Sequence, residues 1–354
     1  MKVPVSSIDT FFACSLMVIL IVSSMAATAK VVQPHLDNLA NLNGVDHCQG
    51  LAEYIILNKG NPSDWGKLVY SVPTVFGLAS ETRKPYDLDL DKISRLNSDN
   101  IYSLNYAEIL TALGTNDVTF NIKIHTIFDL STSLTSTQKG ETETTYIFRI
   151  FTSKSGFPIS TWVRCYTIVG NSIHSISSLT NSTGIGIVNT TLPNSINGTA
   201  LFVSFAKAKA YPEMMAFDVH SFSHNSEDPQ PNGSFLQLSP INHILNIFQQ
   251  TPATEVSEAH VFTYNFNYDL SETTNGNQSQ EYNIPRLLDS SPMILVVNGD
   301  NDTTSFIEWT AYPQLPLEIG VDFDLNSQSK VAAFNYIVSI DSVLYTSIIT
   351  CRSG

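Results

Sequence analysis

The segment Tyr146-Ile-Phe-Arg-Ile-Phe151 is followed by the turn Ser155-Gly-Phe-Pro158 and then by Trp162-Val-Arg-Cys-Tyr-Thr-Ile-Val169. Runs of this length, rich in aromatic and β-branched residues and separated by turn residues, are typical of antiparallel strands. Similar runs follow at 180–192, 200–206 and 215–222. The pattern predicts a sandwich of two antiparallel sheets over residues 143–226.

A second β-rich block follows the polar linker SHNSEDPQPNG at residues 223–233. Because polar, proline-rich stretches between apolar runs are typical of loops, the linker marks a boundary. Apolar runs then recur at 235–238, 243–248, 259–268, 293–298, 306–312, 318–324 and 332–351. They predict a second sandwich over residues 234–354.

Residues 30–130 read as helical and then extended. A long amphipathic helix should end near Asn58, because Gly60 offers a left-handed cap and Pro62 cannot continue the helix. Asn105 and Glu108 form a capping box for a short helix. The alternating apolar residues at 118–124 then predict a half-buried strand. The predicted fold class is therefore mainly β with N-terminal helices.

The stretch from Phe11 to Ala29 carries no charge. As a helix it would be roughly 28 Å long, enough to cross a bilayer. It predicts a signal-anchor over residues 1–29, with the N-terminus inside and the ectodomain outside. The alternative is a secretory signal cleaved near Ala29. The anchor is favoured because apolar residues continue at helical spacing beyond it, at Leu36, Leu39, Leu42, Val45, Cys48, Ala52 and Ile55.

Composition agrees with export. Only 14% of the residues are charged, and the formal charge of −14 disfavours nucleic acid as a partner. Of the cysteines beyond the anchor, Cys48, Cys165 and Cys351, two can form one bridge, and three pairings are open. Glycosylation acceptor motifs occur at Asn181, Asn189, Asn197, Asn232, Asn277 and Asn301.

No pattern for catalysis or for a cofactor emerges. Of the eight histidines only His220 and His224 are close in sequence, and on a strand they would stand about 13 Å apart, too far to share a metal. Asp87, Asp89 and Asp91 lack the spacing of a calcium loop, so they read as a helix cap. Phosphate-binding and nucleophile motifs are absent from the sequence. We therefore expect no cofactor, no metal site and no enzymatic activity.

Two resemblances extend this picture. The order of NPSDWG at 61–66, FGLA at 76–79, LDKI at 90–93, the segment 106–113 and FNI at 120–122 resembles the front module of archaeal membrane-anchored surface proteins related in layout to type IV pilins. The region from Gly156-Phe-Pro158 to Leu192-Pro193 resembles immunoglobulin-like repeats of adhesins and the regulatory sandwich of carboxypeptidases. The resemblances imply a pilin-like front module over residues 30–130 and a scaffold sandwich without catalytic residues.

The leading hypothesis is a membrane-anchored extracellular structural or adhesive protein, with pilin-like assembly as a variant. Its expected partners are the lipid bilayer, through Phe11 to Ala29, and other surface proteins or copies of itself. An extracellular solute-binding or sensing domain is the second hypothesis, and a surface hydrolase the third. A cleft between domains that holds convergent polar groups would favour the second.

Overall fold

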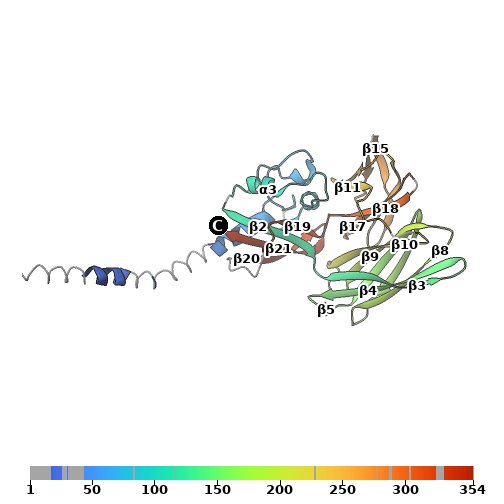
Figure 1. Cartoon of the computed structure of the whole chain (residues 1–354), viewed down its shortest axis with the longest axis horizontal. Coiled ribbons are helices and arrows are strands. Elements are labelled where there is room, and N and C mark those ends of the chain that lie inside the picture. The colour runs from blue at the N-terminus through green and yellow to red at the C-terminus, as the bar shows by residue number, and fades with distance from the viewer. Residues whose placement is uncertain are drawn as a thin grey trace, which may run out of the picture.

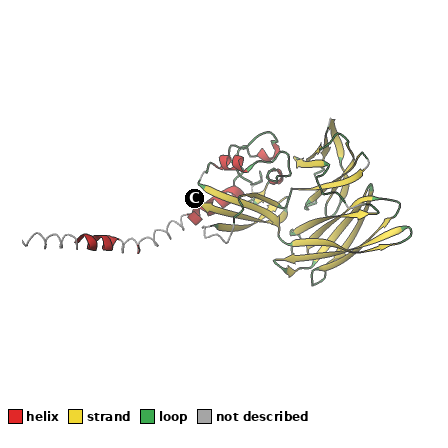
Figure 2. Ribbon diagram, in the orientation of Figure 1, coloured by secondary structure: helices red, strands yellow, loops and turns green. Residues whose placement is uncertain are grey.

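Strands dominate the molecule, as the alternating apolar pattern predicts (Figure 2). The computed structural model describes residues 17–25, 30, 44–82, 84–115, 117–226, 229–276, 278–286, 289–302, 304–323 and 331–353. Its strands form five sheets. Four of these sheets build two sandwiches, and the fifth belongs to a separate domain that carries the N-terminal helix (Figure 1).

The first sandwich confirms the β character expected of residues 143–226 and adds two strands to it. One sheet contains β3 (Asp129–Lys139), β4 (Glu143–Lys154), β5 (Phe157–Pro158) and β8 (Ile185–Pro193), and the other contains β6 (Thr161–Val169), β7 (Ser172–Leu179), β9 (Gly198–Ala208) and β10 (Met215–His224). Phe148 stacks on Phe202 across the two sheets with ring centroids 3.9 Å apart. The sequence did not indicate β3 and β7, because their side chains are mostly polar and exposed.

The second sandwich follows the polar linker. One sheet contains β11 (Leu236–Ile241), β12 (Ile244–Gln249), β15 (Ser271–Gly276) and β16 (Ser279–Asn283), and the other contains β13 (Thr254–Phe262), β14 (Asn267–Asp269), β17 (Met293–Asn301) and β18 (Thr304–Tyr312). Buried side chains of both sheets, such as Ile247 and Leu295, form its core. The sandwich therefore ends near residue 312.

The two sandwiches pack against each other through one sheet of each. Tyr166, Leu201 and Phe205 of the first meet Phe262 and Ile294 of the second in a separate buried cluster. A sheet that is covered on both faces needs apolar residues at successive positions. This explains the almost unbroken apolar run at 200–206, and it joins the sandwiches into a stack of four sheets.

The remaining sheet forms what we call the base domain, residues 44–126 and 317–353. Its strands run in the order β1 (Asp87–Leu88), β20 (Ala332–Ile340), β21 (Val343–Ser353), β2 (Val118–Thr126) and β19 (Leu317–Gly320). The sequence suggested that residues 317–353 belong to the second sandwich, whereas their hydrogen bonds join them to β2. Both sandwiches are thus inserted between β2 and β19.

The segment 332–351 is a hairpin rather than one long strand. Asp341 and Ser342 reverse the chain with φ angles of 48° and 69°. Such left-handed pairs are typical of two-residue hairpin turns, but glycine and asparagine mark them more clearly in a sequence. The turn was therefore not recognised, although the apolar residues on either side of it were.

Helix boundaries in the base domain follow the predicted caps. The helix at 44–57 stops before Gly60, whose φ is 76°. α3 (Tyr106–Leu113) has the predicted capping box, with Asn105 and Glu108 bonding each other's backbone N–H groups, and Gly114 caps its end. The short helices η1 (Trp65–Lys67) and α2 (Leu90–Ser94) complete the domain.

One disulfide closes the base domain. Cys48 of the N-terminal helix is bonded to Cys351 of β21, 303 residues away in the sequence, and Cys165 is a buried free thiol. Figure 1 places the C-terminus beside the N-terminal helix, at the end of the molecule opposite the sandwiches. The three pairings that the sequence left open are thereby reduced to one.

The predicted anchor is described only in part. Residues 17–25 form a helix with exposed apolar side chains, and the rest of Phe11 to Ala29 lies outside the described residues. Within the part of the chain that the structure describes, no helix has the length and apolar character needed to span a membrane.

Candidate functional site

A cleft of about 490 Å³ lies between the base domain and the second sandwich. Its walls come from residues 67, 80, 82, 84, 87–91 and 341–342 of the base domain and from residues 243, 286, 289 and 293 of the sandwich. We call it the charged cleft, because its lining includes five aspartates, two lysines, Arg286 and His243. It is a cleft between domains with convergent polar groups.

Asp91, in the wall of the charged cleft, is held by hydrogen bonds. Asp91 is 4% exposed, and its Oδ1 accepts hydrogen bonds from the Tyr312 hydroxyl at 2.5 Å and from the Asn242 backbone N–H at 2.7 Å. Burial, together with the Asp91 carboxylate, raises the pKa of Tyr312 well above its usual value. Hydrogen bonds to a charged group are among the stronger ones in proteins. These contacts therefore fix the base domain to the second sandwich.

Two further aspartates are occupied by neighbouring donors. Asp89 is the N-cap of α2, as predicted, and accepts from the backbone N–H groups of Asp91 and Lys92. Asp87 accepts from the hydroxyls of Thr82 and Ser339. Among the described residues, no group of three or more His, Cys, Asp or Glu side chains is arranged to hold a metal.

Other charged groups of the cleft lack a direct partner in the described part of the chain. Lys67 and Arg286 take part in none of the ion pairs found there, and neither does Asp341. The buried Nδ1 of His243 has no hydrogen-bond partner. Such free groups at a domain junction are suited to binding a polar ligand.

Neighbouring charges shift the pKa values of two groups in the cleft. Burial lowers the pKa of His243, and the nearby cations Arg286 and Lys67 lower it further. Desolvation raises the pKa of Asp341, and the carboxylates of Asp87 and Asp289 raise it further. Lys67 also acts on the Asp89 carboxylate, and the Asp91 carboxylate lies near His243 through Asn242 and Tyr312, so both signs of charge are interspersed in the cleft.

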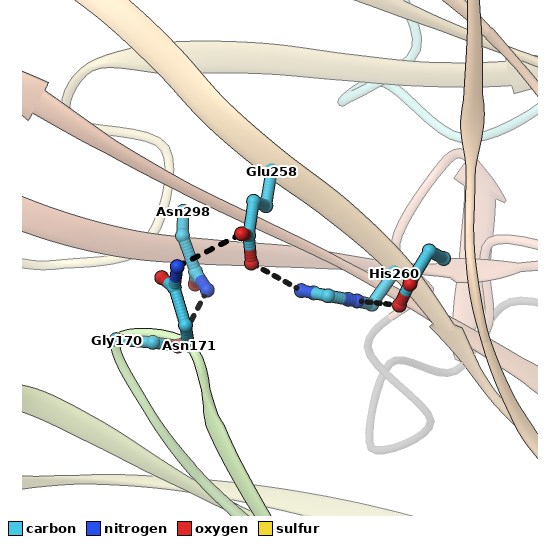
Figure 3. Close-up of polar contacts among 6 residues, drawn as sticks. Gly170, Asn171, Glu258, His260 and Asn298 are labelled. Carbon is cyan, nitrogen blue, oxygen red and sulfur yellow. Dashed lines mark hydrogen bonds and ion pairs between the residues drawn. The ribbon is translucent and has the colours of Figure 1, made fainter.

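A second polar cluster lies where the two sandwiches meet (Figure 3). His260, 5% exposed, has Nδ1 2.9 Å from Asp269 and Nε2 3.2 Å from Glu258. A catalytic histidine needs one nitrogen free to exchange a proton with a nucleophile. Because both nitrogens of His260 face carboxylates, the cluster is not arranged as a catalytic triad.

This cluster instead joins the sandwiches. Asn171, in the turn between β6 and β7, donates to Glu258 at 2.8 Å, and Asn298 of β17 donates to the Gly170 carbonyl at 2.8 Å (Figure 3). Both bonds connect the first sandwich to the second beside their apolar interface. We call this group of contacts the polar clamp.

The histidines considered for a metal have other roles. His224 is fully buried on β10, with its ring nitrogens 2.7 Å from the Tyr146 hydroxyl and 3.1 Å from the Pro193 carbonyl. His220 lies on the same strand with its ring edge against Phe148.

The asparagines of the six predicted glycosylation motifs differ in their surroundings. Asn181, Asn189 and Asn197 are exposed on the first sandwich. Asn232 is also exposed, but its side-chain amide bonds both the N–H and the carbonyl of Trp309. Asn301 is half-buried and accepts from two threonine hydroxyls, and Asn277 lies outside the described residues. Glycosylation of these sites stays a prediction.

The key residues of the charged cleft escaped sequence analysis. Lys67, His243, Arg286 and Asp341 come from four separate segments and belong to no motif. The only part of the cleft with a recognisable sequence pattern is the alternating aspartates at 87–91, and that pattern predicted a helix cap rather than a binding site. Only the insertion of the sandwiches into the base domain brings these segments together.

Comparisons with known proteins do not identify the chain. A scan against known protein families finds no match, and a search among curated proteins finds none. Among solved structures, HBP35 of Porphyromonas gingivalis is 11% identical with a TM-score of 0.20. The alignment covers 56% of this chain and 64% of that protein, less than two thirds of its length. A likeness of this size carries no argument about fold or function.

Proposed function

We propose that the chain is an anchored extracellular protein without enzymatic activity that binds a polar ligand in the charged cleft. The observation that carries the proposal is the set of unpaired charged side chains, Lys67, Arg286 and Asp341, at the junction of two domains. Charged side chains without protein partners in a cleft between domains are able to pair with the charges of a polar ligand. This corresponds to the solute-binding or sensing function among the hypotheses drawn from the sequence.

The anchoring part of the proposal rests on the sequence. The uncharged stretch from Phe11 to Ala29 would insert into the bilayer, and the helix at 44–57 would follow it outside. The bridge between Cys48 and Cys351 supports export, because disulfides persist in oxidising compartments. Membership of the archaeal surface-protein group, with immunoglobulin-like sandwiches, belongs to the same proposal.

A structural or adhesive role, with pilin-like assembly as its variant, is the second candidate. The four stacked sheets favour it, because the apolar contact and the polar clamp together make a stiff unit. Such a unit could present exposed sandwich surfaces to other surface proteins or to copies of itself. Ligand binding and adhesion are compatible if the ligand belongs to another surface molecule.

The geometry gives less support to a surface hydrolase. Ser172 and His174 are 3.0 Å apart, but they lie on β7, outside the charged cleft, with Ser172 half-buried and His174 exposed. Nδ1 of His174 contacts no carboxylate in the described residues. A third group that orients the histidine is therefore missing from this pair.

Localisation can be tested with the full chain expressed in a host that exports it. Intact cells are treated with a membrane-impermeant biotin reagent, and membranes are then washed with carbonate. We expect biotinylated protein that stays in the membrane fraction, and a variant lacking residues 1–29 that stays unlabelled inside the cell. Full-length protein that is soluble and unlabelled would contradict the proposal.

A further inference from the structure

The second sandwich has another pocket, of about 690 Å³, at the end opposite to the charged cleft. It opens where β12 and β15 end and where β13 and β16 begin. β12 starts next to His243 in the wall of the charged cleft and ends at Gln249 in the wall of this pocket. The two are therefore separate sites, one at each end of the sandwich.

Amide side chains line one wall of this pocket, so we call it the amide pocket. Gln280 of β16 is paired with Asn275 of β15 and with Ile247 of β12, and directly paired residues share one face of a sheet. Gln249 lies two residues after Ile247 and points the same way. Ile247 belongs to the core of the sandwich, where inward positions are normally apolar. The inner face of the sheet therefore ends in amides where its apolar core would otherwise continue.

One of these amides has a buried oxygen atom without a donor. Gln280 is 8% exposed, and its Nε2 donates to Glu272 at 3.3 Å. This bond fixes the orientation of the amide, because an amide oxygen could not donate to a carboxylate. The Oε1 atom is left buried and accepts from no described residue. Because buried polar atoms without partners are rare and cost stability, this oxygen points to a donor that comes from inside the pocket.

Other polar groups of the amide pocket are free to bind as well. The side chains of Gln249, Asn275 and Gln278 make no hydrogen bond to a described residue, and Glu255 takes part in none of the ion pairs found there. Asn275, Gln278 and Glu255 are exposed at the rim. Each amide offers two N–H donors and one acceptor oxygen. The pocket thus presents many donors and acceptors within one small volume.

The composition of the wall indicates which ligand would fit. Among the lining residues, which the structure describes, Glu255 is the only charged one, so an anion would be repelled and would find no cation. A hydroxyl group can donate to the Gln280 oxygen or to Glu255 and can accept from the amide nitrogens. Val256 adds an apolar surface for C–H groups. The volume lies within the range of about 300–1,000 Å³ that is usual for small-molecule sites.

On this basis we propose that the amide pocket binds a neutral mono- or disaccharide, with one sugar hydroxyl donating to Oε1 of Gln280. The site is separate from the charged cleft, so the inference goes beyond the proposed function and does not rest on it. A saccharide site at the open end of a sandwich also gives the adhesive candidate a concrete chemistry, namely contact with the glycans of another surface molecule.

The test uses the unglycosylated full chain and a panel of neutral sugars: glucose, galactose, mannose, N-acetylglucosamine, maltose and lactose. Binding is detected by saturation-transfer NMR, and dissociation constants come from titrations in the same assay. We expect binding of one or more of these sugars. Raising the salt concentration should leave the dissociation constant unchanged, because a neutral ligand forms no ion pair that salt could screen.

Gln280→Leu removes the oxygen that has no donor and should weaken sugar binding about tenfold or more. The variant extends the apolar inner face of the sheet, so its stability in urea should equal or exceed that of the wild type. Asn275→Ala changes an exposed side chain on the neighbouring strand and should also weaken binding. Gln138→Leu, at an exposed glutamine of β3 in the first sandwich, is the matched control and should bind like the wild type.

The failure of every sugar in the panel to bind would overturn the inference. Binding that Gln280→Leu and Asn275→Ala leave unchanged would overturn it too, and so would an affinity that falls steeply with salt. Sugar binding that is instead lost in Asp341→Asn would place the sugar in the charged cleft. That result would remove the amide pocket as a site and would support the proposed function.

Discussion

Removing the disulfide should destabilise the base domain far more than any single contact in it. The change is Cys48→Ala together with Cys351→Ala, so that no free thiol is left at the site. The bridge encloses a loop of 303 residues. With the loop-entropy relation, a loop of that length stabilises the folded chain by about 5.7 kcal/mol at 25 °C. Measured effects reach about 5 kcal/mol, so we expect a loss of about 3–5 kcal/mol.

The architecture explains why the loss should be concentrated in one domain. β2 pairs with β21 along nine residues, although the two sandwiches separate them in the sequence. Without the bridge, the unfolded base domain has to bring these distant segments together from a much larger set of conformations. The sandwiches are each formed from nearer segments and are less affected.

Hydrogen exchange read by mass spectrometry separates the domains, because it reports the free energy of opening for each peptide. In the double variant, the free energy of the opening reaction that exposes peptides of β2 and β21 to exchange should be about 3–5 kcal/mol lower than in the wild type. Peptides of β9 and β17 should change little. Cys165→Ala is the matched control, since this thiol is unbridged. A change below about 1 kcal/mol in β2 and β21 would refute the loop-entropy reasoning.

Three further predictions concern single side chains. Burial lowers the pKa of Lys92 from 10.5 to about 8, so the folded chain releases this proton before the unfolded chain does. Stability should therefore rise between pH 8 and 10.5, by at most roughly 3 kcal/mol, and Lys92→Met should flatten this rise in urea titrations. Asn105→Ala removes the side chain that caps α3 and bonds the Glu108 N–H, and should cost about 1 kcal/mol in the same assay. Glu258→Ala breaks the polar clamp at Asn171 and should cost about 1–2 kcal/mol, with faster exchange in the β6–β7 turn. An unchanged rise in stability with pH would contradict the first of these predictions, and equal stability of wild type and variant would contradict the other two.

Local patterns in the sequence predicted the local structure well. The capping box at Asn105 and Glu108, the helix end before Gly60 and the cap at Asp89 all involve residues within four positions of each other. Apolar alternation likewise placed the strands that have one face in a core. These features depend on residues that are close to one another in the chain, so a local sequence pattern predicts them directly.

Features that depend on distant pairing could not be predicted. Residues 317–353 are as apolar and as alternating as those of the sandwich before them, so periodicity assigned them to the same domain. Two of their strands, β19 and β21, pair instead with β2, whose residues lie 193–235 positions earlier in the chain. β3, with a run of exposed serines and threonines, lacked the apolar face that marks a strand. The charged cleft depends on this long-range pairing, because Asp341 belongs to the β20–β21 hairpin.

The insertion of the sandwiches also determines how the chain responds to proteolysis. The exposed residues 231–233 of the linker between the sandwiches offer a cleavage site between Cys48 and Cys351. After one cut there, the N-terminal fragment keeps Cys48 and the C-terminal fragment keeps Cys351, so the bridge still joins them. Limited proteolysis should therefore give one full-length band on a non-reducing denaturing gel and two fragments after reduction. In the variant that lacks both cysteines, two fragments should appear without reductant. Separate fragments from the unreduced wild type would mean that the bridge does not form in solution, and the second sandwich would then be held to the N-terminal fragment by non-covalent contacts alone after a cut.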